Sequence, residues 1–131
     1  MRAMEVQKAI VARLRAYSAL TDIVSGVFDD VPQDAEFPYV AIGDMTLIPF
    51  DTFDTVGDEQ TIMIHTWSDY RGRKEVKTIQ AHIYGALNRH ELDLDNGTLI
   101  GCDQELSEDF VDADGLRRHG VQRFRLLVDN D

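Results

Sequence analysis

Four histidines and one cysteine are the side chains best suited to metal binding or nucleophilic chemistry in this chain. A zinc site needs three or four converging ligands, usually with two of them closely spaced on one element. His65 and Asp69 form a short pair, but it crosses from a predicted strand into a predicted helix cap. His82, His90 and His119 fall on other segments. The sequence therefore predicts no metal site.

Nucleophilic catalysis would require Cys102 or a serine beside a positioned base and oxyanion donors. The chain has no G-x-S-x-G elbow, and Cys102 falls in a predicted strand, where a lone cysteine most often acts as a small buried hydrophobe. With 24 acidic residues, no single carboxylate pair is informative for acid–base chemistry. We assign no catalytic residue. A small enzyme of unrecognised type, using His65 and Asp69 or an acidic pair, stays an alternative.

Two short motifs are similar to ligand-binding loops and depart from them at essential positions. The glycines of 115–120 have the spacing of a phosphate-binding loop, but Val121 and Gln122 replace the required Lys and Ser or Thr. The segment 93–97 has its glycine one place too early for a calcium loop, and Gln104 stands where Glu is needed. A turn explains 93–97 better, so the sequence predicts no cofactor.

The charge balance disfavours further classes of function. The chain of 131 residues has 24 acidic and 13 basic residues, a net charge of −11. Stable nucleic-acid binding depends on Lys and Arg at phosphates, so this class is disfavoured, and a membrane-surface role is disfavoured for the same reason. One cysteine excludes an internal disulfide. No apolar stretch is long enough for a membrane span or a signal peptide.

The basic residues are clustered along the chain. Three clusters occur with Arg89 between them: Arg2, Lys8, Arg13 and Arg15; Arg71, Arg73, Lys74 and Lys77; Arg117, Arg118, Arg123 and Arg125. No Lys or Arg lies from Ala16 to Tyr70 or from His90 to Leu116. This pattern fits general solubility through net charge. It also fits a polarised surface that meets other copies or a partner electrostatically.

Hydrophobic periodicity predicts two main helices. In the first, Val6, Ile10, Leu14 and Tyr17 share one face. The second spans Arg71 to Arg89, with Ser68 or Asp69 as its cap, and buries Val76, Ile79, Ile83 and Leu87.

The remaining segments predict strands. These are 37–42, which begins near Pro38 and extends through 45–50 until Pro49 ends it; 60–67; 98–106; and 121–128. The Asn96-Gly97 turn predicts a hairpin with Leu92 and Leu94 opposite Leu99 and Ile100. We expect exposed loops at 51–59, which should be mobile, and at 109–115. The prediction is one α+β domain over residues 1–131, with a mostly antiparallel sheet and the two helices on one face.

Several motifs in order resemble the tail terminator, or tail completion, proteins of long-tailed phages and phage-like gene transfer agents. They are Val31-Pro32-Gln33, the run Phe37-Pro38-Tyr39-Val40-Ala41-Ile42-Gly43, Trp67-Ser68 before a long helix, Asp114-Gly115, and His119-Gly120-Val121 with Phe124. The resemblance covers nearly the whole chain. It implies a structural subunit with neither enzymatic activity nor cofactor.

The resemblance also implies partners and a location in the virion. A sixfold ring of this chain would cap the tail tube protein and present its other face to a neck or stopper protein. DNA would pass through the lumen without specific binding, because an acidic wall offers no phosphate contacts. A different head–tail connector, a minor tail protein or an acidic binding module are the alternatives.

A head-to-tail ring needs two different complementary surfaces on each subunit. The segregated basic and acidic segments could supply these surfaces. The segments 51–59 and 109–118 are candidates for loops that become ordered only on docking to neighbouring rings. The candidate interface residues are Asp51, Asp54, Asp58, Glu59, Asp112, Asp114, Arg117 and Arg118.

Overall fold

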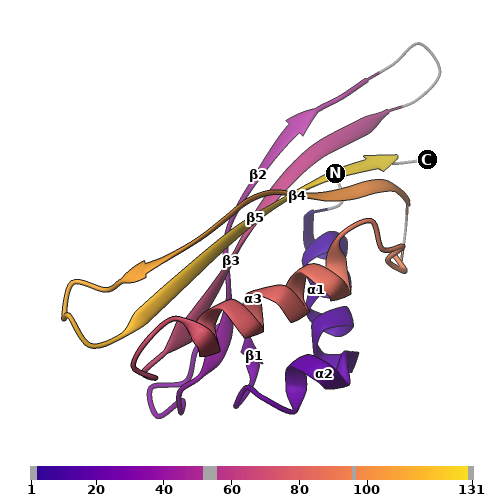
Figure 1. The fold of residues 1–131 in the computed structure, drawn as a ribbon. Coiled ribbons are helices and arrows are strands. Elements are labelled where there is room, and N and C mark those ends of the chain that lie inside the picture. Colours follow the sequence, from indigo (N-terminus) through magenta and orange to yellow (C-terminus); the bar gives the residue numbers. More distant parts are fainter. Residues whose placement is uncertain (1–2, 52–55, 96, 130–131) are drawn as a thin grey trace.

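The computed structural model describes residues 3–51, 56–95 and 97–129 as a five-stranded sheet with helices packed on one face (Figure 1). The helices are α1 (Ala3–Ala16), α2 (Ser18–Thr21) and α3 (Lys74–Leu87); the strands are β1 (Val27–Phe28), β2 (Tyr39–Pro49), β3 (Gly57–Ser68), β4 (Thr98–Val111) and β5 (Arg118–Asp129). The strand order is β1-β2-β3-β5-β4, and only the β1–β2 pair is parallel. The predicted α+β class is confirmed.

Helix α1 buries the face that its periodicity predicts. Val6, Ile10 and Leu14 are fully buried, because the 3.6-residue repeat places them on the stripe that faces the sheet. Arg15 holds the end of the helix to β1, since its guanidinium donates two hydrogen bonds to the Val27 carbonyl at 3.1 and 2.7 Å. These contacts fix α1 over the same sheet face as α3.

Helix α3 begins at Lys74 rather than at the predicted Arg71, and its predicted caps are wrong. Ser68 donates instead to Glu75 Oε1 at 2.7 Å, and its hydroxyl accepts the Tyr70 amide at 3.2 Å. Gly72 has a φ of +97°, which is incompatible with helical backbone, so the helix starts only after it. The residues that the periodicity places on the buried face are all fully buried: Val76, Ile79, Ile83 and Leu87.

The strands are longer than the sequence predicts, and the predicted loops are correspondingly shorter. Gly57–Glu59 belongs to β3 and Asp109–Val111 belongs to β4. β3 pairs with β5 along its whole length, from Gly57 opposite Asp129 to Ser68 opposite Arg118. This continuous pairing overrides the low strand propensity of acidic residues. β2 ends at Pro49 as predicted.

The predicted hairpin around Asn96-Gly97 is wrong. Among the described residues, β4 pairs with β5, and the segment before Gly97 forms no strand. Leu92 is buried in the core and Leu94 packs against it, so apolar burial decides the path of this segment in place of cross-strand pairing. Asn96 lies outside the described residues.

The central strands place alternate side chains in the core. Ile62 and Ile64 of β3 and Phe124 and Leu126 of β5 face the helices and are fully buried. The residues between them, such as Met63 and His65, face the opposite side of the sheet, which the helices leave uncovered (Figure 1). The long β2–β3 and β4–β5 hairpins extend past the helices at opposite ends of the sheet.

Candidate assembly surfaces

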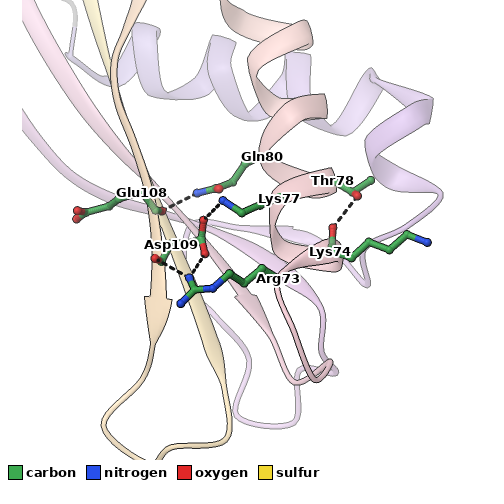
Figure 2. A network of polar contacts seen from close by, with 7 residues as sticks. All are labelled: Arg73, Lys74, Lys77, Thr78, Gln80, Glu108 and Asp109. Carbon is green, nitrogen blue, oxygen red and sulfur yellow. Dashed lines mark hydrogen bonds and ion pairs between the residues drawn. The ribbon is translucent and has the colours of Figure 1, made fainter.

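The carboxylate of Asp109, near the end of β4, forms ion pairs with two basic side chains at the start of α3, Arg73 and Lys77 (Figure 2). Arg73 Nη1 lies 2.5 Å from Asp109 Oδ1, and Lys77 Nζ lies 2.7 Å from Oδ2. The Asp109 side chain is only 6% exposed, and the hydrogen bond from Lys77, with that from Arg73, holds its pKa below the usual range. Gln80 also donates to the Glu108 carbonyl at 2.8 Å. These contacts fix β4 to α3.

Five other bases in the described part of the chain pair with acids, and four of these pairs join segments that are well separated along the chain. The further ion pairs of the described residues are Lys8–Asp95, Arg89–Asp103, Arg117–Asp114, Arg123–Glu105 and Arg125–Glu59. The fold therefore brings together charges that are separated along the sequence, which reduces the surface polarity expected from the clusters. In the part of the chain that the structure describes, the side chains of Arg71 and Lys74 make neither an ion pair nor a hydrogen bond.

The candidate interface residues of the first hairpin lie in different environments. Asp51 is exposed two residues after the end of β2, and Asp54 lies outside the described residues. Asp58 and Glu59 were expected in a loop, but both lie in β3. Asp58 is buried, and Glu59 accepts from Arg125 Nε at 2.7 Å, which lowers the Glu59 pKa.

The candidates of the second hairpin gather at the β4–β5 turn. Asp114 Oδ1 accepts the backbone amides of Arg117 and Leu116 at 3.0 and 2.9 Å, and these bonds lower the Asp114 pKa. The Arg117 guanidinium pairs with Asp114 and lies 4.7 Å from the ring centre of Phe37. Arg118 begins β5. Asp112 lies in the same turn, so the two candidate groups occupy opposite ends of the sheet (Figure 1).

A histidine pair on the uncovered sheet face was missed by the sequence analysis. His65 Nδ1 lies 2.8 Å from His119 Nε2, and Trp67 stacks on His119 with ring centres 3.8 Å apart. Burial lowers the pKa of both histidines, and the neighbouring His65 lowers that of His119 further. The ring of His65 lies over Gly43, where a Cβ would come within 2.4 Å of Nε2. The two histidines are 54 residues apart in the sequence, and the register of β3 against β5 brings them together.

Both hairpin ends expose large apolar side chains. Ile48, Phe50 and Val56 are 59%, 48% and 59% exposed at the β2–β3 end. At the β4–β5 end the exposed residues are Phe110, Val111 and Leu116. A groove of about 260 Å³ lies between the segment after α2 and the start of α3, lined by Ile23, Tyr70, Lys74, Glu75 and Thr78. Clustered apolar exposure of this kind is typical of interaction surfaces.

The described residues offer little for catalysis or metal binding. They contain no group of three or more His, Cys, Asp or Glu side chains arranged to hold a metal ion. Burial raises the pKa of Cys102 to about 12, which keeps the thiol protonated at neutral pH. No described helix has the length and apolar character needed to cross a membrane. The fold and its surfaces define a small α+β subunit suited to assembly.

Comparison with known proteins gives the family. Residues 8–129 match the family described as tail completion protein gp17, and the chain belongs to that family of structural phage tail proteins. It is 30% identical over 126 residues to the tail completion protein gp17 of Bacillus phage SPP1, covering 96% of this chain and 93% of that one. The predicted resemblance, and with it a place in a phage-type virion, is confirmed.

Two solved structures share the fold. A chain from the virion of a native gene transfer agent particle superposes with a TM-score of 0.87 at 24% identity, covering 98% of this chain and 97% of that chain. The structure of bacteriophage SPP1 gp17 superposes with a TM-score of 0.64 at 27% identity, covering 97% and 91% of the two chains.

Proposed function

We propose that this chain assembles into a ring, with six subunits as the expected number, that terminates the tail tube and joins it to the neck of the capsid. One domain supplies all contacts, and the subunit has no enzymatic role. Family membership supports the tail completion part of this proposal. The observation that carries the ring is that the sheet of one subunit has two unlike edges with no further strand paired to them among the described residues.

The two edges differ in position and sequence. β4 is the last strand of the sheet, and all of its described pairing is with β5. At the other side, β1 covers β2 only at Val40 and Ala41, and no other described strand pairs with β2 from Ile42 to Pro49 on that side. Unlike edges favour head-to-tail contacts between copies, and such contacts form a ring when the rotation from one copy to the next closes.

The acid excess suits a ring through which DNA passes. Seven bases of the described residues form ion pairs within the subunit, and the chain has 24 acidic against 13 basic residues, so acidic charge dominates the outer surface. A negative wall repels the phosphate backbone and provides no sites that would retain it. We therefore propose that DNA moves through the lumen without specific binding, and that the stable partners are the tube protein and a neck or stopper protein.

The proposal is tested by mixing the purified chain with the tail tube protein of the same particle. Light scattering and negative-stain images compare the mixture with each protein alone. We expect rings, or tubes of uniform length that are capped at one end. A persistent monomer that leaves tube growth unchanged would contradict the proposal, and duplex DNA binding at about 0.15 M salt would contradict the passive lumen.

A further inference from the structure

The end of the β2–β3 hairpin combines exposed apolar residues with negative charge. We call Ile48, Phe50, Asp51 and Val56 the β2–β3 tip. Its three apolar side chains are each about half exposed or more, and Asp51 is exposed beside them. No Lys or Arg lies from Ala16 to Tyr70. Arg125 of β5 neutralises Glu59, whereas Asp51 forms no ion pair with a described residue. An exposed apolar surface beside a negative charge is complementary to a partner surface that has an apolar recess and a positive charge.

The groove beside α3 has those properties. We call Ile23, Tyr70, Lys74, Glu75 and Thr78 the α3 groove. Ile23 and Tyr70 are 38% and 49% exposed, so the recess presents apolar surface to solvent. The Glu75 carboxylate in the groove is held by the Ser68 hydroxyl at 2.7 Å. Lys74 points away from the Asp109 network (Figure 2), and its ammonium makes no ion pair with a described residue.

The tip and the groove cannot meet within one subunit. β3 runs the length between them, from Gly57 beside the tip to Ser68 beside the groove. Its 12 residues span about 40 Å at the usual rise of a strand. The two surfaces lie at opposite ends of the molecule (Figure 1). Each copy therefore carries both halves of a contact that can form only between copies.

We propose that the β2–β3 tip of one copy docks in the α3 groove of the next copy, with Asp51 facing Lys74 and Arg71. This contact rests on the proposed ring, for which it supplies one head-to-tail interface. The β4–β5 end also exposes apolar residues, but its Asp114 and Arg117 satisfy each other within the turn. Charge complementarity therefore selects the β2–β3 tip as the occupant of the groove.

Disulfide trapping between two variants tests the contact directly. Chains carrying Val56→Cys and Ile23→Cys are mixed under assembly conditions with a mild oxidant. The native Cys102 is 1% exposed and gives little background. The matched control replaces Ile23→Cys with Ile100→Cys, an equally apolar position that is 65% exposed on β4. We expect at least tenfold more mixed disulfide with Ile23→Cys than with Ile100→Cys.

A charge exchange provides an independent measurement. Lys74→Glu alone and Asp51→Lys alone should each raise the concentration needed for assembly about tenfold, and combining both in one chain should restore it. Thermal melting confirms that each variant folds. If wild-type rings form while the trapping yields are equal and the exchange fails to restore assembly, the contact is wrong and the ring stands. If the wild-type chain forms no ring with the tube protein, both the ring and the contact are overturned.

Discussion

At the scale of single residues, the uncovered sheet face holds a hydrogen bond between two histidines whose protonation changes with pH. The His65–His119 hydrogen bond persists only while one of the two facing nitrogens lacks a proton. Asp44 and Asp112 favour protonation of His65 and His119 respectively, but burial outweighs them and lowers both pKa values. Trp67, the only tryptophan of the chain, stacks on His119, so its fluorescence provides a signal for the protonation of that ring.

We expect Trp67 fluorescence to fall on acidification with a midpoint below pH 6.5, because protonated imidazole quenches a stacked indole and the His119 pKa is lowered. The folded state then binds fewer protons than the unfolded state, so the melting temperature should decrease as the pH falls below about 6.5. His119→Gln should flatten this pH dependence, while His82→Gln on α3 should leave it in place. A fluorescence midpoint above pH 6.5 would contradict the conclusion that burial lowers the His119 pKa.

The Asp109 network is the second residue-scale test. Asp109→Asn removes the carboxylate that Arg73 and Lys77 share, and we expect unfolding in denaturant to lose about 1–2 kcal/mol. Asp103→Asn is the matched control, because its ion pair with Arg89 is 3.4 Å long and both side chains are more than half exposed. Equal losses in the two variants would contradict a specific role for the buried carboxylate.

The same carboxylate has a defined pH window. The pKa of Asp109 lies below its ordinary value of 3.8, so its contribution to stability is complete above that value. The contribution disappears as the pH falls through the lowered pKa. Denaturant curves between pH 5 and pH 2 should therefore converge for wild type and Asp109→Asn.

At the scale of elements, close approach of α3 to β5 depends on a glycine. A Cβ at Gly120 would lie 2.5 Å from Gln80 Nε2 and 2.9 Å from Val76 Cγ2. The Gln80 side chain is already committed to the Glu108 carbonyl, and the Gln80 carbonyl accepts from Gln122 Nε2 at 3.0 Å. The helix therefore sits at a distance from the sheet that only glycine permits.

Gly120→Ala should lower the free energy of unfolding by about 1–3 kcal/mol, as overpacking commonly does. Gly101→Ala on β4 should change it by less than about 0.5 kcal/mol, since no atom lies within 4 Å of the added Cβ. Chemical denaturation of both variants measures the difference. Equal effects would show that helix–sheet spacing is not controlled at Gly120.

The sequence predicts some elements better than others for identifiable reasons. The faces of α1 and α3 follow directly from their apolar spacing, because one periodicity determines which residues are buried. The start of α3 and the extra length of β3 and β4 were missed, since a positive φ at Gly72 and pairing along β5 act beyond local propensity. The His65–His119 pair depends on strand register, which no spacing along the chain encodes.

The ends of the strands also limited the prediction of the interface. The candidate acids and bases were chosen from their segments, but the fold gives Asp114, Arg117 and Glu59 partners within the subunit. The exposed apolar residues of the hairpins became apparent only once the strands were seen to extend past the helices (Figure 1). Lys74 was grouped with its cluster in the sequence, yet its neighbours Arg73 and Lys77 bind Asp109 and it does not.

At the scale of the whole molecule, the two ends of the subunit present different surfaces. One end carries the apolar, acidic β2–β3 tip, and the other end carries the apolar groove with Lys74. The two sides of the sheet also end in different open strands, β4 and the outer part of β2. Unlike ends and unlike edges are what the proposed head-to-tail ring requires of its subunit.

The most direct test of this account is electron cryo-microscopy of tail tubes assembled in the presence of the chain. We predict a ring of six copies at one end of each tube, with this sheet fitted into the density and unlike surfaces in contact around the ring. Bare tube ends, or copies paired through identical surfaces, would contradict the account.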